Sequence, residues 1–166
     1  MSPKTPLLLP ALDPSTLPEL RSTLYPEPLK RRVAGRAKRK LGDACGITQY
    51  GVNLVTLEAG SESALRHWHT HEEEFVYVLD GEVVLINDAG EQTLRAGDCA
   101  GYPAGKADAH HFVNRSGRPV RYLEIGSRVD EDVSSYPDDD LQWLKRGVDG
   151  KQTLVPAHKN GKPYGD

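Results

Sequence analysis

The sequence predicts an all-β protein built from closely spaced antiparallel strands, arranged as a sandwich, a barrel or a jelly roll. Between residues 49 and 126, short segments rich in β-branched and aromatic residues alternate with turn signals, and no convincing long helix separates them. A parallel α/β sheet would need helical crossovers, for which this spacing leaves no room. The length of 166 residues suits one domain with a single core.

The strand signals are separated by two clear turns. Asp80-Gly81 predicts a tight hairpin, because both residues tolerate positive φ, and residues 87–90 predict a second turn. The predicted strands are residues 50–58, 75–79, 83–86, 92–94, 99–102, 110–114 and 120–125.

The segments on either side of this core differ from it in composition. Residues 1–48 are predicted to form a Pro-rich, basic arm, with at most a short helical turn near residues 15–20. Residues 127–166 are predicted to pack on the barrel as a C-terminal extension. Within it we expect a short helix over residues 140–145 and a polar tail that frays from residue 158.

Composition excludes several classes of function. The net charge of -3 gives no reason to expect a nucleic-acid partner, and we interpret the basic residues 30–40 and acidic residues 129–140 as solvent-facing or docked on each other. No segment has the roughly 18 apolar residues of a membrane span. Cys45 and Cys99 form no C-x-x-C pattern, so we expect a reducing, cytoplasmic location. The arm cannot build its own core, which favours a homodimer.

Three of the six histidines lie in the stretch RHWHTHEEEFVYVLDGE, residues 66–82. Alternate side chains of a strand share a face, so His67 and His69 are predicted to project together and Trp68 to the other side. A carboxylate a few residues later, on the partner strand of a hairpin, can return opposite them. Two imidazoles and a carboxylate on one face form a metal site with open positions, which suits Fe(II), Mn, Co, Ni or Zn.

This stretch resembles the first motif of the cupin superfamily, G-(X)5-H-X-H-(X)3–4-E-(X)6-G. Its positions are occupied by Gly60, His67, His69, Glu74 and Gly81, with one extra residue between the first two.

The second cupin motif, G-(X)5-P-X-G-(X)2-H-(X)3-N, follows in the right order. Its positions are occupied by Gly97, Pro103, Gly105, His110 and Asn114. Four residues instead of two precede the histidine, so His111 stands as an alternative to His110. The spacing to Asn114 and the shared strand face favour His110.

The resemblance covers roughly residues 49–126 and implies a cupin-like antiparallel β-barrel, or double-stranded β-helix. It also implies one divalent metal ion, such as Zn, Fe, Mn or Ni, with the ligands His67, His69, Glu74 and His110. Glu72 and Glu73 stand as alternatives to Glu74. We expect His71, His111 and Asn114 to lie around these ligands, either beside the metal or at the rim of the site. We expect structural turns at Gly81, Gly97, Pro103 and Gly105.

Cupin-like proteins include dioxygenases, decarboxylases, isomerases, lyases and proteins that only bind ligands. We therefore predict a metal-dependent enzyme that acts on a small oxygen-rich metabolite, such as a carboxylic acid or a sugar derivative. The alternative is a small-molecule binding or sensing protein without turnover. No catalytic residue can be named from the sequence; His71 and Glu124 are candidates for the base, and Trp68 and Tyr102 could line a pocket or pack outside.

Overall fold

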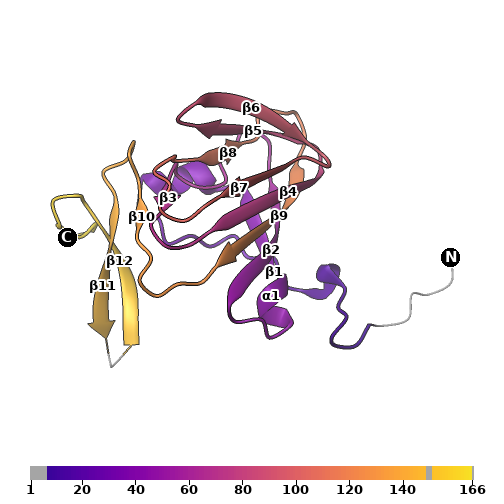
Figure 1. Ribbon diagram of the computed structural model, residues 1–166, viewed down its shortest axis with the longest axis horizontal. Helices are drawn as coiled ribbons and strands as arrows, with labels where there is room; N and C mark the ends of the chain where they lie inside the picture. The colour runs from indigo at the N-terminus through magenta and orange to yellow at the C-terminus, as the bar shows by residue number, and fades with distance from the viewer. Residues whose placement is uncertain (1–6, 149–150, 166) are drawn as a thin grey trace.

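The computed structural model describes residues 7–148 and 151–165, and two antiparallel sheets form its main body (Figure 1). The larger sheet contains, in spatial order, β1 (Arg36–Lys40), β2 (Tyr50–Leu57), β9 (Val120–Ser127), β4 (Glu74–Asp80) and β7 (Cys99–Tyr102). The smaller sheet contains β6 (Gly90–Arg95), β5 (Glu82–Asn87) and β8 (His111–Val113). The prediction of an all-β, antiparallel jelly roll is confirmed.

The core lies between these two sheets, because alternate residues of each strand point inward. Along β4, Val76 and Val78 are buried, whereas Phe75, Tyr77 and Leu79 lie on the outer face. Burying a valine side chain contributes about 1.5–3 kcal/mol. The core cluster consists of Val55, Leu57, Val76, Val78, Val83, Leu85, Phe112, Val120 and Tyr122.

The turn at Gly81 joins the two sheets. β4 pairs with β7 and β9, whereas β5 pairs with β6 and β8, so the hairpin predicted at Asp80-Gly81 is wrong. Gly81 has a φ of 86°, and a Cβ there would lie 3.1 Å from Cα of Val120. Asp-Gly occurs both in hairpin turns and in turns that lead from one sheet to another, so the local sequence could not distinguish the two structures. The second predicted turn does join a hairpin, with Asn87 paired to Gly90.

The N-terminal segment runs along the barrel before it enters the larger sheet. It contains the 3-10 turns η1 (Pro14–Thr16) and η2 (Leu29–Val33), and the short helix α1 (Leu41–Ala44) follows β1. The basic stretch thus supplies an edge strand, which we had not predicted from its charge. Nη1 of Arg32 lies 2.9 Å from Oδ1 of Asp139, so the basic and acidic stretches do contact each other.

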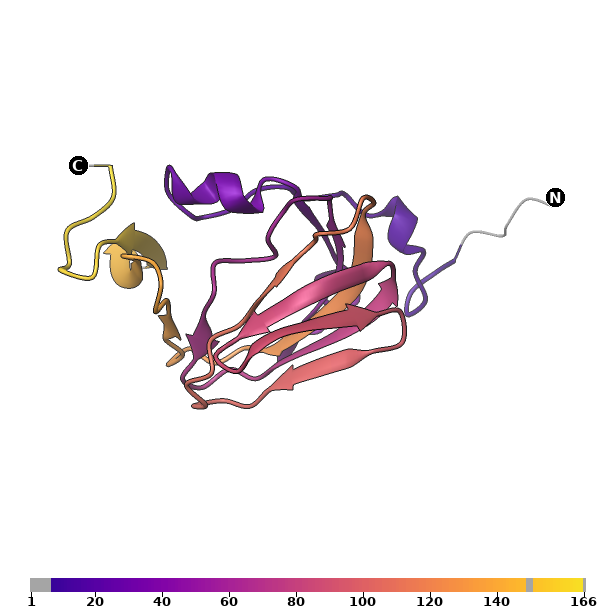
Figure 2. The same ribbon diagram turned by 90° about the horizontal axis from the view of Figure 1, so that it is seen from above.

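The C-terminal segment forms a second hairpin, β11 (Gln142–Val148) and β12 (Lys151–Ala157), on the side of the barrel opposite η1 (Figures 1 and 2). The helix predicted over residues 140–145 is therefore wrong. Pairing with β12 satisfies the backbone of β11, and Trp143 stacks on Tyr25 with ring centroids 6.1 Å apart. The tail does not fray within the described residues, since Nδ1 of His158 lies 2.7 Å from Oδ2 of Asp140. None of the helices in the described part of the chain is long and apolar enough to cross a membrane.

Candidate metal centre

His67, His69 and Glu74 converge at one end of the barrel. Nε2 of His67 and Nε2 of His69 lie 3.7 and 3.6 Å from Oε2 of Glu74, and the three side chains form a group that could hold a metal ion. The glutamate does not return across a hairpin, because β3 (Trp68–His69) pairs with β10 (Ser134–Ser135) and not with β4. The histidines and the carboxylate instead reach the site from different sheets.

His110 lies at the same cluster, just before β8. Its backbone pairs with that of His67, and its Nε2 lies 3.0 Å from Oε2 of Glu74. The next residue, His111, points the other way, with Nδ1 3.1 Å from the carbonyl oxygen of Ala64 and 3.4 Å from Oε2 of Glu62. Successive side chains of an extended segment project to opposite sides, so only one of the two histidines can face Glu74.

Hydrogen bonds set the orientation of two of the imidazoles. Nδ1 of His67 lies 2.7 Å from the carbonyl oxygen of Leu65, and Nδ1 of His69 lies 2.6 Å from Oδ2 of Asp132. Both partners accept, so each Nδ1 carries the proton and each Nε2 directs its lone pair toward Glu74. Donor atoms about 2.0–2.2 Å from one ion lie roughly 3–3.5 Å apart, close to the separations found here. The residues therefore fit a divalent metal ion.

The pKa values of two members match this use. Burial lowers the pKa of His67 to about 4, although the charge of Glu74 opposes the shift. Burial alone would raise the pKa of Glu74, but the hydrogen bond from His110 and the nearby imidazoles outweigh it and bring this pKa to about 2. At neutral pH His67 is uncharged and Glu74 is ionised, and these are the forms that bind metals.

A cavity of about 300 Å³ opens beside the cluster. Its wall includes Trp68, His69, Glu72, Glu74, Tyr102 and His110. The ring of Tyr102 stacks on that of His110 with centroids 3.3 Å apart. The sequence left open whether Trp68 and Tyr102 line a pocket or pack outside it, and both residues line the cavity. The second motif also contributes its proline, Pro103, and its lengthened loop contributes Lys106 and Asp108. A groove of about 950 Å³, which shares His69 and Glu72, lies along the C-terminal hairpin.

The other predicted residues lie outside this cavity. The ring of His71 is exposed and its Nδ1 lies 2.8 Å from Oγ1 of Thr70. Asn114 is fully buried and donates to the carbonyl oxygens of Leu57 and Arg118, each at 2.8 Å, so it holds a loop together. The carboxylate of Glu124 pairs with Nζ of Lys38 at 2.5 Å.

The predicted turn residues hold the chain around the site. Gly81, Gly97 and Gly105 have positive φ. The N–H of Gly105, two residues after Pro103, donates to the carbonyl oxygen of His69 at 3.0 Å, so this turn fastens the histidine segment to the second motif.

Sequence reasoning missed Asp132, which lies in the segment after β9 and outside both motifs. Its carboxylate contacts His69, and Oδ1 also accepts the backbone N–H of His71 at 2.8 Å and of Glu72 at 3.0 Å. An acidic run gives no sign of which member will meet a histidine more than 60 positions away, so no local signal could have identified it.

Comparison with known proteins decides the family. Residues 53–126 match the family described as Cupin domain. The crystal structure of a sugar phosphate isomerase of the cupin superfamily from Silicibacter pomeroyi is 38% identical, covers 93% of this chain and 96% of its own, and superposes with a TM-score of 0.85. The chain belongs to the cupin superfamily.

Other solved structures resemble this cupin over shorter lengths. A protein from Acidithiobacillus ferrooxidans, provisionally assigned as a sugar phosphate isomerase, is 35% identical and covers 74% of this cupin and 78% of its own chain, with a TM-score of 0.65. The polyketide cyclase RemF from Streptomyces resistomycificus shares the fold, with 20% identity, coverage of 70% and 78%, and a TM-score of 0.57. No curated protein matches the sequence.

Proposed function

We propose that this cupin is a metal-dependent isomerase that acts on a small phosphorylated sugar. The observation that carries the proposal is its 38% identity, over 93% of its length, to the sugar phosphate isomerase from Silicibacter pomeroyi. The site supports it, because a cluster suited to a metal ion borders a cavity large enough for a small ligand. We propose His67, His69, Glu74 and His110 as the metal-holding residues.

Isomerisation of an aldose to a ketose moves a proton between two neighbouring carbons and needs no external oxidant. A divalent ion at this site would polarise a carbonyl or hydroxyl oxygen. We assign the proton transfer to Glu72, whose side chain lines the cavity between the metal-holding residues and the groove. Its Oε1 accepts the N–H of Val129 at 3.0 Å, which fixes the carboxylate. Glu72 would take the proton from the carbon beside the carbonyl and return it to the former carbonyl carbon, while the proton of the hydroxyl group on the first of these carbons passes to the former carbonyl oxygen.

The rim of the cavity supports a phosphorylated substrate. Lys106, from the lengthened loop, lines the cavity and presents an ammonium group that is largely exposed. Its Nζ lies 3.6 Å from Oδ2 of Asp108, a separation that leaves the ammonium able to bind a phosphate. We propose that Lys106 receives the phosphate end of the sugar while the carbonyl end lies near the metal centre.

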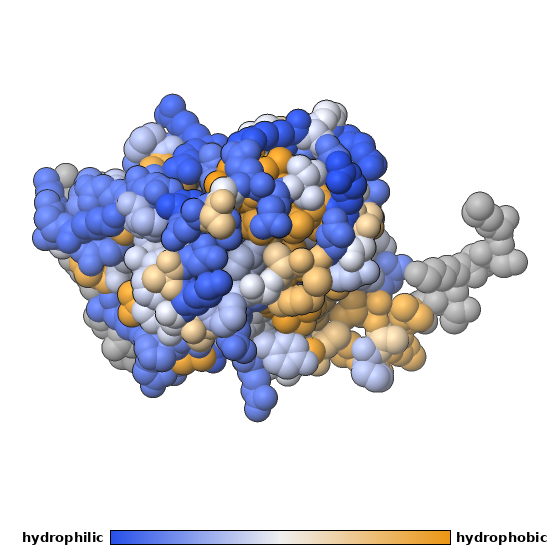
Figure 3. Space-filling model, turned by 45° about the horizontal axis from the view of Figure 1, so that its top comes forward, coloured by the Kyte–Doolittle hydropathy of each residue, from blue (hydrophilic) through white to orange (hydrophobic). Residues whose placement is uncertain are grey.

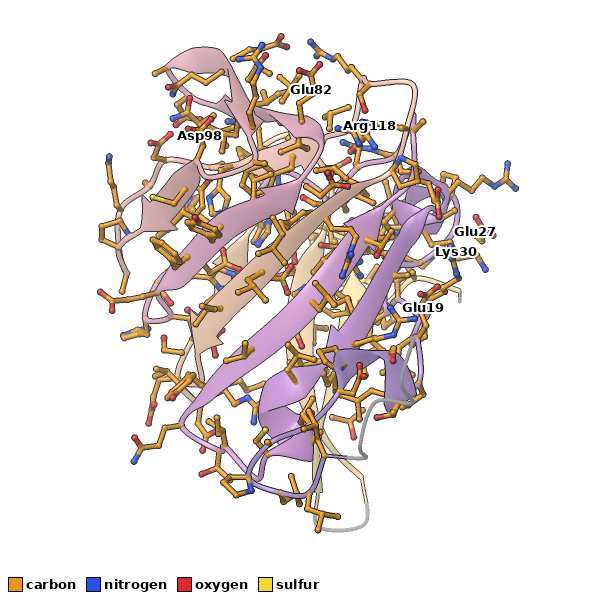
Figure 4. The ribbon with its side chains drawn as sticks, turned by 90° about the vertical axis from the view of Figure 1, so that its right-hand side faces the viewer. Glu19, Glu27, Lys30, Glu82, Asp98 and Arg118 are labelled. Carbon is orange, nitrogen blue, oxygen red and sulfur yellow. The ribbon has the colours of Figure 1, made fainter. Side chains whose placement is uncertain are left out.

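We also propose that this cupin is a cytoplasmic homodimer. The side chains of Phe75, Tyr77 and Leu79 are 40, 39 and 41% exposed on the outer face of the larger sheet. Figure 4 shows this sheet face-on, with the labelled charged residues along its upper and right-hand sides. An apolar face with a polar rim is typical of a protein interface, and we assign a second copy to it. Both cysteines are free and exposed, which suits a reducing compartment.

The test measures metal content and turnover together. Protein purified without chelator is analysed by mass spectrometry and incubated with a panel of aldose phosphates, and interconversion is followed by NMR in D₂O. We expect about one metal ion per chain and deuterium incorporation beside the carbonyl. Both are lost in His69→Ala and kept in His158→Ala, which removes a histidine outside the cluster. Tight binding without turnover would favour the sensing alternative, and failure to bind a metal would contradict the proposal.

A further inference from the structure

Besides Nδ1 of His110 in the metal centre itself, two polar atoms on residues of the cavity wall are buried without a hydrogen-bond partner among the described residues. They are the hydroxyl of Tyr102 and Oδ1 of Asn87. Buried polar groups are nearly always paired, so an unpaired group in a cavity wall marks a place where a bound molecule makes a hydrogen bond.

The polarity of the Asn87 side chain is fixed by the lengthened loop. Nδ2 of Asn87 lies 3.3 Å from Oδ2 of Asp108, and the other oxygen of that carboxylate accepts the backbone N–H of Asp88 at 3.1 Å. An ionised carboxylate only accepts hydrogen bonds, so the NH₂ group must face it. The unpaired atom is therefore the carbonyl oxygen of Asn87, which is an acceptor.

The Tyr102 hydroxyl is held in place by its ring and carries a proton that it can donate. Its ring lies flat on the imidazole of His110, with an interplanar angle of 4°, so the phenol cannot turn freely. An ordinary phenol has a pKa of about 10, which lies far above neutral pH. The phenol stays protonated at neutral pH and offers an O–H donor.

We propose that Tyr102 and Asn87 recognise hydroxyl groups of a polyhydroxylated ligand bound in this cavity. A hydroxyl both donates and accepts, so it complements the tyrosine donor and the asparagine acceptor, whereas an apolar ligand would leave both unpaired. The inference rests on the proposed function, since it specifies which part of a sugar each wall residue reads. The two additional residues of the second-motif loop would serve this recognition, because they bring Asp108 against Asn87.

The test uses D-ribitol 5-phosphate and its 2-deoxy, 3-deoxy and 4-deoxy analogues. These alditol phosphates have no carbonyl group and cannot be isomerised, so calorimetric titration reports binding alone. Wild-type protein is compared with Tyr102→Phe and Asn87→Leu, and with Tyr50→Phe, which removes a hydroxyl from an exposed residue outside the cavity at the start of β2. The thermal midpoint and metal content of each variant are measured first.

We expect the wild type to bind ribitol 5-phosphate about tenfold more tightly than at least one deoxy analogue. Tyr102→Phe and Asn87→Leu should each weaken ribitol 5-phosphate binding about tenfold and no longer distinguish the analogue that lacks their hydroxyl. Tyr50→Phe should behave as wild type. Equal binding of all four compounds, or unchanged discrimination in both variants, overturns the inference, as does no binding of any compound.

The outcome is separable from that of the proposed function. If the protein distinguishes the hydroxyl groups but does not turn over the aldose phosphates, the recognition proposal is supported and the isomerase proposal is contradicted. If the protein turns over the aldose phosphates but both variants distinguish the analogues as the wild type does, the isomerase proposal is supported and the recognition proposal is contradicted.

Discussion

Nδ1 of His69 lies 2.6 Å from Oδ2 of Asp132, a residue of the segment that joins β9 to β10. The carboxylate holds the imidazole with Nε2 toward Glu74, and through its second oxygen it also binds two backbone N–H groups of the turn before β4. A residue outside both cupin motifs thus positions a histidine that we propose as a metal ligand.

Replacing this carboxylate should weaken metal binding. We expect Asp132→Ala to lower metal affinity about 10- to 100-fold, because His69 loses the group that fixes its orientation. Competition with a chromogenic chelator measures the affinity. Asp130→Ala, in the same segment, is the control and should keep wild-type affinity; equal affinity in both variants would show that Asp132 has no positioning role.

The two adjacent histidines of the second motif should respond differently. His110→Ala should lose most of its metal affinity, because Nε2 of His110 faces Glu74. His111→Ala should keep its metal and lose only stability, since its ring bonds to Ala64 and Glu62. Metal content by mass spectrometry and thermal unfolding separate the two effects. The reverse pattern would make His111 the ligand.

Glu72 should affect turnover more than metal content. If it transfers the proton, Glu72→Gln should lower kcat about 10²- to 10⁴-fold while the metal remains bound. Glu73→Gln is the matched control, because Glu73 is the next residue and lines a different surface hollow. Deuterium exchange by NMR and metal analysis provide the two readouts, and a fully active Glu72→Gln protein would rule out this assignment.

The ion pair between Lys38 and Glu124 should make stability depend on pH. Burial raises the pKa of Glu124, but the ammonium of Lys38 outweighs it, so the folded-state pKa lies below the ordinary value of 4.5. Its stabilising effect is therefore fully present above pH 4.5 and is lost as the pH falls through the lowered folded-state pKa. Glu124→Gln should lose about 1–3 kcal/mol at pH 7 and less at pH 3.

Urea unfolding at both pH values measures this loss. Glu91→Gln serves as the control, because its partner Arg115 and the carboxylate are both at the surface. A loss for Glu124→Gln that is the same at both pH values would contradict the linkage.

A charge on the outer face of the larger sheet should dissociate the dimer. We expect Tyr77→Lys to be a monomer at a concentration where wild-type protein is a dimer, because the lysine would face the second copy. Leu154→Lys, which replaces a residue that is 45% exposed on the C-terminal hairpin, should remain dimeric. Light scattering after gel filtration gives the mass. Figure 3 shows that the first described part of the arm, next to the grey terminus, is also hydrophobic, and Leu7, Leu8 and Leu9 are exposed there.

The sequence predicted those features that depend on local pattern. The strands from Tyr50 to Leu57 and from Cys99 to Tyr102 follow from β-rich segments bounded by turns, and the shared face of His67 and His69 follows from alternation. Features that depend on distant pairing were not predictable. The chain crosses between sheets at Gly81, and Asp132 reaches His69 because β10 pairs with β3. Both facts require knowledge of which strands become neighbours.

The strand order of the larger sheet has a consequence for how the chain folds. β9 lies between β2 and β4, with Tyr50 opposite Ser127, so neighbours in space are separated by most of the barrel sequence. Such non-local pairing makes folding slow, since a long loop must close before these contacts form. A nascent chain that ends at β8 contains β2 and β4 but lacks β9, which lies between them in the sheet. The barrel can therefore close only after Ser127 has left the ribosome, and until then β2 and β4 each keep one unpaired edge that can pair with another chain.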